Sequence, residues 1–182
     1  VAELRARIVY SLMLLAVYRL GIFISTPGID RAALNAVMEA RMKDGGLLNL
    51  FNMFSGGALS QASIFALGIM PYVSASIIMQ LLAVVVPSLE RLQKEGAAGR
   101  QKINQYTRYG SIVLSVVQGV GVARTLYSFG RSADPNALEK VVVPDSVSIL
   151  WFSFMTVITL TAGTAFIMWL GERITENGIG NG

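Results

Sequence analysis

The sequence contains neither cysteine nor histidine, and only 14% of its 182 residues are charged. Without these two residue types there is no disulfide, no thiolate nucleophile and no histidine-based acid–base mechanism. Soluble domains carry roughly 25% charged residues, so this chain has too little charge to cover a soluble core. An enzyme is therefore the least favoured class, and we expect neither a cofactor nor a bound metal.

What the sequence does contain is apolar: 53% of the residues are hydrophobic and the mean hydropathy is +0.57. A lipid bilayer explains this excess, because residues facing lipid are apolar as well as buried ones. A helix needs roughly 20 apolar residues to cross the hydrocarbon core of about 30 Å. The sequence predicts an all-α integral membrane protein whose transmembrane helices cover residues 8–26, 64–87, 109–129 and 146–171.

The uncharged stretch from residue 45 to residue 89 is too long for one crossing. As a single helix it would reach roughly 68 Å, about twice the bilayer thickness. Gly56 and Gly57 supply a break, and the polar residues around them are unsuited to lipid contact. We predict a re-entrant half-helix over residues 47–63 that precedes the second full span. Such backbone at membrane depth occurs only inside protein or beside a cavity, so a cavity is implied.

Basic residues are concentrated between the second and third predicted spans. By the positive-inside rule, the loop 88–108 lies in the cytoplasm, together with the N-terminus and the tail 172–182. We interpret this loop as a topology signal that contacts anionic lipid. It lacks the Gly-Lys-Ser/Thr ending of a phosphate-binding loop, and we expect no direct nucleic-acid recognition. Its basic residues are Arg91, Lys94, Arg100, Lys102 and Arg108.

Two features inside the predicted spans have alternative interpretations. Arg19, in the first span, either faces the bundle interior or a wet cavity, or extends to the outer headgroups. Ile69 and Val73 lie one helical turn apart, beside Pro71, which we expect to kink the helix. They either form an apolar constriction of the kind that closes by dewetting, or face lipid and neighbouring helices. The four spans contain no Asp or Glu, which disfavours proton-coupled carriers.

Four long motifs closely resemble the bacterial SecY family. They are Phe-Asn-Met-Phe-Ser-Gly-Gly-Ala-Leu-Ser at 51–60, Ser-Ile-Phe-Ala-Leu-Gly-Ile-Met-Pro-Tyr at 63–72, Ile-Asn-Gln-Tyr-Thr-Arg-Tyr-Gly at 103–110, and Met-Trp-Leu-Gly-Glu-Arg-Ile-Thr-Glu-Asn-Gly-Ile-Gly-Asn-Gly at 168–182. The resemblance covers nearly the whole chain, in order and with the appropriate spacing. It implies the N-terminal half of a ten-span channel whose two pseudosymmetric halves enclose an hourglass pore, in the bacterial inner membrane.

The resemblance also implies roles for particular residues. Ile69 and Val73 would contribute to the pore ring. Ser76 and Gln80, on the second span, would belong to the lateral gate, which the second and third spans would line from this half of the channel. The plug that closes the outer vestibule would consist of Phe51, Asn52, Met53, Phe54, Ser55, Gly56, Gly57, Ala58, Leu59 and Ser60.

The implied partners are the SecE and SecG subunits, the SecA motor or a ribosome on the cytoplasmic face, the translocating polypeptide with its signal sequence, and membrane lipid. The implied function is passage of unfolded polypeptides across the membrane, with lateral release of hydrophobic segments. Two alternatives stay open on the sequence: a solute transporter with a broken-helix site at the midplane, and a structural membrane scaffold.

Overall fold

The computed structural model of the protein describes residues 2–42, 47–128 and 142–180. Within these ranges every regular element is a helix, apart from one isolated bridge between Ser25 and Ser63. The helices are α1 (Ala2–Ile22), α2 (Arg31–Met42), α3 (Leu47–Phe54), α4 (Met70–Val85), α5 (Pro87–Lys94), α6 (Ala97–Ser128) and α7 (Ile149–Asn177).

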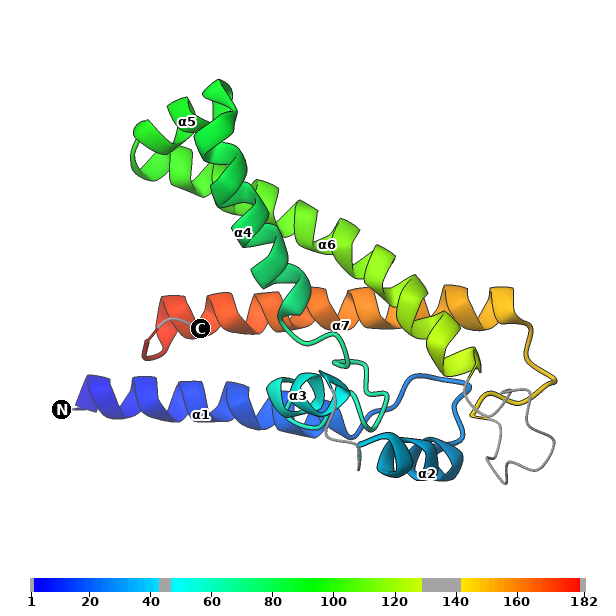
Figure 1. Ribbon diagram of the computed structural model, residues 1–182. Coiled ribbons are helices and arrows are strands. Elements are labelled where there is room, and N and C mark those ends of the chain that lie inside the picture. Colours follow the sequence, from blue (N-terminus) through cyan, green and yellow to red (C-terminus); the bar gives the residue numbers. More distant parts are fainter. Residues whose placement is uncertain (1, 43–46, 129–141, 181–182) are drawn as a thin grey trace.

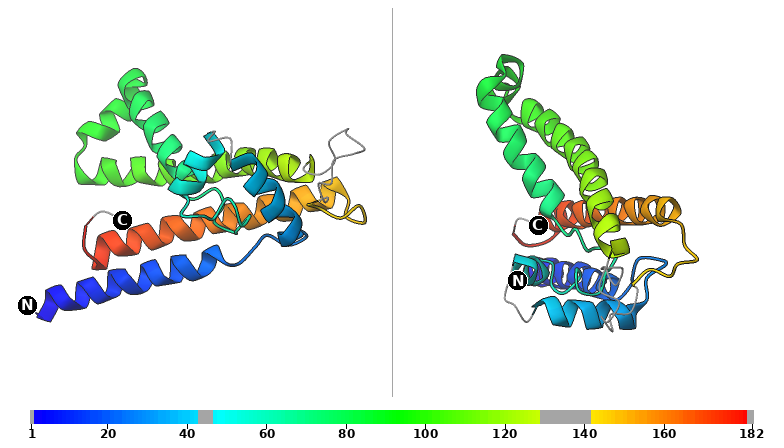
Figure 2. Two further views of the ribbon diagram at one scale, coloured as in Figure 1. Left: turned by 60° about the horizontal axis from the view of Figure 1, so that its bottom comes forward. Right: turned by 45° about the vertical axis from the view of Figure 1, so that its right-hand side comes forward.

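The helices form a long pair and an arm. α1 and α7 lie side by side and run in opposite directions, so both chain ends lie at the same end of this pair (Figure 1). α4 leads away from the pair, α5 forms the tip of the arm, and α6 returns along α7. Both views of Figure 2 show the arm standing apart from α1. α2 lies at the opposite end of the pair from the termini.

In the described part of the chain, α6 and α7 are long and apolar enough to cross a membrane. α4 and α5 meet the same criterion only together, and the pair is bent by 101°. α1 does not meet it, because Glu3, Arg5, Arg7 and Arg19 lie along it. The fold is therefore helical with two or three candidate spans, and the count of four stays a prediction.

The helix of the second predicted span, 64–87, is shorter than expected, and its bend is elsewhere. Residues 55–69 form turns rather than helix, with Gly68 at φ +55°, and α4 begins only at Met70. The expected kink at Pro71 is wrong, because proline in the first helical turn removes no hydrogen bond. The bend lies at Pro87, which keeps Val86 extended at φ −97° and ψ 111°.

The other predicted boundaries differ because hydropathy marks the membrane and not the helix end. Only Leu47–Phe54 of the predicted half-helix 47–63 is helical. The predicted loop 88–108 is largely helical, with Glu95 and Gly96 in the turn between α5 and α6. α7 continues to Asn177, into the predicted tail. Arg, Lys, Gln and Glu are good helix formers, so a helix continues through charged residues until glycine or proline ends it.

Small side chains set the helix contacts. A Cβ added at Gly110 of α6 would lie 3.6 Å from Cβ of Ala75 in α4, and one at Gly119 would lie 3.4 Å from Cα of Val157 in α7. Such residues let helix backbones approach closely, which replaces the hydrophobic drive that lipid does not supply. At the end of the α1–α7 pair opposite the termini, four apolar residues of α2 are buried in a cluster. Ala33, Leu34, Val37 and Met38 pack there with Val142, Val143, Leu126 and Phe152.

Candidate functional site

The turns of residues 55–69 lie between α1 and α7, and they touch both helices at glycines. A Cβ added at Gly163 of α7 would lie 1.9 Å from the carbonyl oxygen of Ile64. One added at Gly21 of α1 would lie 2.0 Å from Cε2 of Phe65. No side chain fits at either distance, so the sequence allows this insertion only because glycine stands at both positions.

An aromatic stack holds the segment between the two helices. The ring of Phe65 lies 5.3 Å from that of Tyr18 in α1 and 5.9 Å from that of Phe166 in α7, and the interplanar angles are 16° and 3°. Phe65 is 2% exposed. Aromatic pairs in this distance range stabilise packing beyond the area they bury. The stack therefore fixes the segment at both sides.

Residues 61–64, which we call the anchor, pair with the chain that follows α1. This pairing gives the backbone of an irregular segment the partners that it would lack in lipid. The amide and the hydroxyl of Thr26 both donate to the carbonyl of Ala62 at 2.9 Å, the amide of Ile64 to Ile24 at 3.0 Å, the hydroxyl of Ser63 to Gly21 at 3.1 Å, and the hydroxyl of Ser25 to Gln61 at 3.1 Å.

The tip of the predicted plug, residues 52–60, is folded on itself. The side-chain oxygen of Asn52 accepts from the amide of Ser60 at 2.9 Å, and its carbonyl accepts from the amide of Gly57 at 2.9 Å. Gly56 and Gly57 have φ of +63° and +88°, values that favour glycine. The polar side chains here therefore satisfy backbone groups of a turn.

Two residues of α1 reach this tip. The hydroxyl of Tyr18 donates to the carbonyl of Ser55, and the guanidinium of Arg19 to that of Gly56, both at 3.1 Å. The guanidinium also lies 5.9 Å from the centre of the Phe23 ring. The guanidinium thus has two partners within the chain, although Arg19 itself is exposed, and the choice between its two interpretations stays open.

The remaining plug residues differ in burial. Ala58 is fully buried and packs in a cluster with Ile22, Phe65 and Ile167, whereas Met53 is 71% exposed. Leu59 is half-buried, and its amide donates to the hydroxyl of Ser55 at 3.2 Å. The backbones of Phe51 and Phe54 belong to α3, and their side chains lie outside the described residues.

The predicted ring and gate residues share one face of α4. Ile69 is the N-cap, and its carbonyl accepts from the amide of Val73 at 3.0 Å. One helical turn further, the side-chain amide (Nε2) of Gln80 donates to the hydroxyl of Ser76 at 3.2 Å. Ile69 is 56% exposed and Val73 38%, because α4 is buried on another face, at Pro71, Ala75 and Ala83. This chain alone leaves the ring and gate face uncovered.

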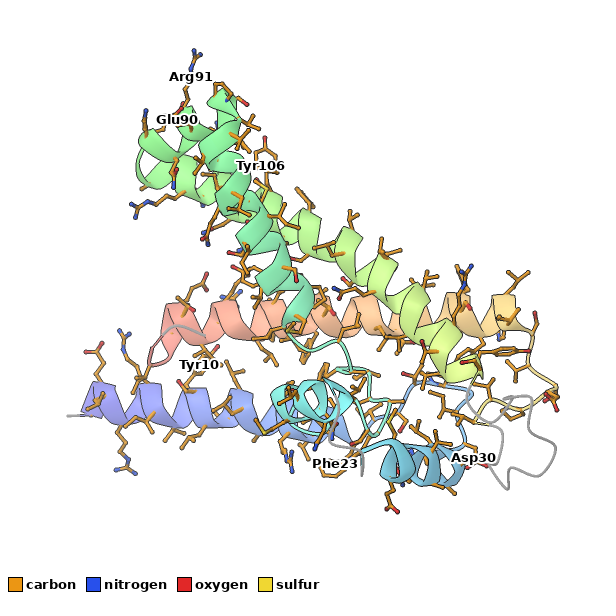
Figure 3. All side chains as sticks on the ribbon, viewed as in Figure 1. Tyr10, Phe23, Asp30, Glu90, Arg91 and Tyr106 are labelled. Carbon is orange, nitrogen blue, oxygen red and sulfur yellow. The ribbon has the colours of Figure 1, made fainter. Side chains whose placement is uncertain are left out.

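The predicted basic residues lie at the arm. Arg91 projects from its tip beside Glu90 (Figure 3), and Lys94 pairs with Glu90 one turn away. Arg108 behaves differently: its Nε lies 2.6 Å from a carboxylate oxygen of Glu172, which joins α6 to α7. Arg100 and Lys102 are exposed.

Sequence reasoning missed the contacts between elements. The pairing of Arg108 with Glu172 had a signal, since opposite charges flank the third and fourth predicted spans on the same side. The hydrogen bond from Tyr18 to Ser55 had none. The structure has a cleft of about 460 Å³ between α2 and the plug, and sequence reasoning did not predict the residues that line it. They are Ser25, Arg31, Leu34, Asn35, Met38, Glu39, Asn52, Ser60 and Gln61.

Long apolar helices with an irregular segment inserted between them define the chain as a multispanning α-helical membrane protein. The sequence model of the SecY family matches residues 63–182. The chain is similar to protein translocase subunit SecY of Escherichia coli strain K12, 51% identical over 99% of this chain and 38% of the relative. It is also similar to protein translocase subunit SecY of Buchnera aphidicola subsp. Acyrthosiphon kondoi, with 51% identity over 99% of this chain and 48% of the relative.

Protein translocase subunit SecY of Vibrio cholerae is 50% identical over 100% of this chain and 38% of the relative. The chain belongs to the SecY family and corresponds to its N-terminal part. It spans between 38% and 48% of the length of these relatives. Members of this family are not enzymes.

Proposed function

We propose that this chain is the N-terminal part of the pore-forming subunit of a channel that passes unfolded polypeptides across a membrane and releases hydrophobic segments into lipid. The names of its relatives support this function. The observation that carries it is the hydrogen-bonded irregular segment between α1 and α7, next to a helix face that the chain leaves uncovered. An irregular segment at membrane depth requires surrounding protein or a cavity.

In this proposal α1, α4, α6 and α7 are four spans of the bacterial inner membrane. Their alternating directions and the position of both chain ends at one end of the α1–α7 pair support it (Figure 1). Arg5 and Arg7 of α1 belong to the same end. Basic residues favour the cytoplasmic side, which puts the N-terminus and α5 there.

The plug lies at the end of α1 that is remote from the N-terminus, and in this orientation it closes the outer half of the pore. Ile69 and Val73 form this half's part of the constriction. An apolar constriction seals against water and ions without a fixed ligand. That suits passage of polypeptides of any sequence, because a site with specific affinity would retain them.

The uncovered face of α4 contributes to the lateral gate in this proposal, with Ser76 and Gln80 paired on it. Polar side chains on a lipid-facing helix are costly unless they have partners. Their mutual hydrogen bond therefore fits a face that alternates between a closed seam and lipid. We propose SecE and SecG as companion subunits and SecA or a ribosome as cytoplasmic partners, as the family resemblance implies.

Site-specific crosslinking tests the pore assignment. This chain has no cysteine of its own, so single cysteines report one position each once any cysteine elsewhere in the channel has been replaced. In the complete channel, cysteines replacing Ile69 or Val73 are expected to crosslink to a stalled secretory chain. Cysteines replacing Leu81 and Val85, which are 64% and 76% exposed on another side of α4, serve as matched controls. Crosslinks at the controls but not at Ile69 and Val73 would remove these two residues from the pore.

Deleting residues 52–60 tests the plug assignment. We expect the deletion to raise the ion conductance of the resting channel in planar bilayers, because the outer half of the pore loses its stopper while the constriction stays. Conductance equal to that of the intact channel would contradict the assignment. The anchor is left in place, so α4 keeps its attachment to α1.

A further inference from the structure

We propose that Tyr18 and Arg19 form a latch that holds the plug tip closed, and that the tip moves about the anchor when the latch releases. This inference rests on the proposed plug and adds the residues that set its resting position. The latch consists of the two hydrogen bonds from α1 to the carbonyls of Ser55 and Gly56.

The two ends of the segment are held in different ways. Backbone and side-chain hydrogen bonds in both directions join the anchor to residues 21–26, and its neighbour Phe65 stacks between α1 and α7. The backbone hydrogen bonds of the tip run within residues 52–63, as between the amide of Ser63 and the carbonyl of Ala58 at 2.9 Å. The tip therefore keeps its own fold when the latch releases. The buried contact of Ala58 with Ile22 and Ile167 must separate at the same time.

The tip also offers carbonyls that suit such a latch. Gly56 and Gly57 have positive φ, so the chain turns here and its carbonyls leave the helical pattern. The Gly56 carbonyl accepts from Arg19, whereas the Ser55 carbonyl accepts from Tyr18 and also from the amide of Ala58 at 3.2 Å. A charged donor makes a stronger hydrogen bond than a neutral one, by roughly a factor of two. Arg19 is accordingly the main element of the latch and Tyr18 the lesser one.

The position of Arg19 supports this role. An arginine in an apolar helix is costly, and such residues face the protein interior or water and take a partner there. The guanidinium of Arg19 has two, the Gly56 carbonyl and the Phe23 ring. Loss of the carbonyl on plug opening leaves the charge to be rehydrated, which is possible only where water reaches it. A wet vestibule beside the tip provides that water.

Resting conductance of the complete channel in planar bilayers tests the latch. Arg19→Gln is expected to raise it about tenfold, the factor that corresponds to roughly 1.4 kcal/mol and to the loss of one charge-assisted hydrogen bond. Tyr18→Phe removes one hydroxyl, keeps the stacked ring and is expected to raise conductance about threefold. Arg19→Lys keeps the charge and is expected to lie between the intact channel and Arg19→Gln.

The matched control is Arg124→Gln, which removes an exposed arginine from α6 and is expected to leave the conductance unchanged. Both latch variants are then combined with deletion of residues 52–60. If the latch acts through the tip, neither substitution adds conductance to the deleted channel.

The outcomes separate the latch from the plug. An unchanged conductance in Arg19→Gln and Tyr18→Phe, in channels where the deletion does raise it, would overturn the latch and leave the plug assignment intact. An equal rise with and without the tip would overturn it as well, because Arg19 would then act elsewhere. No effect of the deletion itself would overturn both. Should Arg19→Gln not assemble, Tyr18→Phe decides by the same criteria.

Discussion

The uncharged stretch from residue 45 to residue 89 contains two regions that differ in how their backbone groups are hydrogen-bonded. The segment 55–69 is irregular, and side chains such as Ser63, which is fully buried, bond its backbone to α1. α4 is regular, satisfies its own backbone, and leaves Val84 79% exposed. The first region finds its contacts within this chain, whereas the second presents a surface for lipid or for other protein.

This contrast shows where glycine is required and where it is dispensable. At Ile64 the backbone of the irregular segment is itself the packing surface, so the neighbouring Gly163 of α7 must be glycine. Along α4, Ala75 packs against Gly110 of α6, and small side chains suffice there. Substitutions that add volume should therefore separate the two regions.

The largest effect is expected for Gly163→Val. Its Cβ would overlap the carbonyl oxygen of Ile64, which belongs to anchored backbone and cannot turn aside. Overpacking typically costs about 1–3 kcal/mol, and a backbone clash should exceed that range. Thermal unfolding of the purified complete channel, followed by tryptophan fluorescence, measures the loss.

The matched control for that substitution is Gly121→Ala in α6, where an added Cβ meets nothing within 4 Å. It should stabilise the helix by about 0.5–1 kcal/mol, since alanine is the better helix former. A Gly163→Val channel that melts like the parent would show that the segment does not lie against α7.

A smaller effect is expected for a pair of substitutions on α4. Ala75→Leu inserts bulk against Gly110 and should cost about 1–3 kcal/mol. Ile77→Leu lies on the exposed side, where Ile77 is 52% exposed, and should stay within about 0.5 kcal/mol. The same unfolding measurement compares them. Equal losses at the two positions would mean that the remainder of the channel packs on this face as tightly as α6 packs on the other.

The smallest effect is expected for Thr26→Val at the anchor. The substitution removes the hydroxyl bond to Ala62, but the amide of Thr26 still donates to the same carbonyl at 2.9 Å. We expect a loss of about 0.5–1 kcal/mol. Thr125→Val, whose hydroxyl bonds within exposed helix α6, is the control and should change the melting temperature by less. If Thr125→Val lowered the stability more than Thr26→Val, the anchor hydrogen bond would matter less than one within an exposed helix, which contradicts the prediction.

Much of the fold could be predicted from the sequence because charge and length constrain a membrane chain strongly. The turn-back before α4 followed from the length of the uncharged stretch, and the break at Gly56 and Gly57 from their residue type. The kink expected at Pro71 was wrong, because Pro71 lies in the first turn of α4. Helix also continues through much of the loop 88–108, because hydropathy marks the membrane and not the helix end. The pairing of Arg108 with Glu172 needed distances that spacing along the chain does not give.

The sequence by itself determined that the chain is helical and belongs in a bilayer, and that the stretch 45–89 is too long for a single helical crossing. Each of these conclusions depends only on local composition and length. Only the tertiary structure decided that α1 and α7 enclose the irregular segment, that Tyr18 and Arg19 reach its tip, and which face of α4 stays uncovered. These features depend on contacts between residues as far apart as Ile64 and Gly163, and such contacts are fixed by how the helices pack.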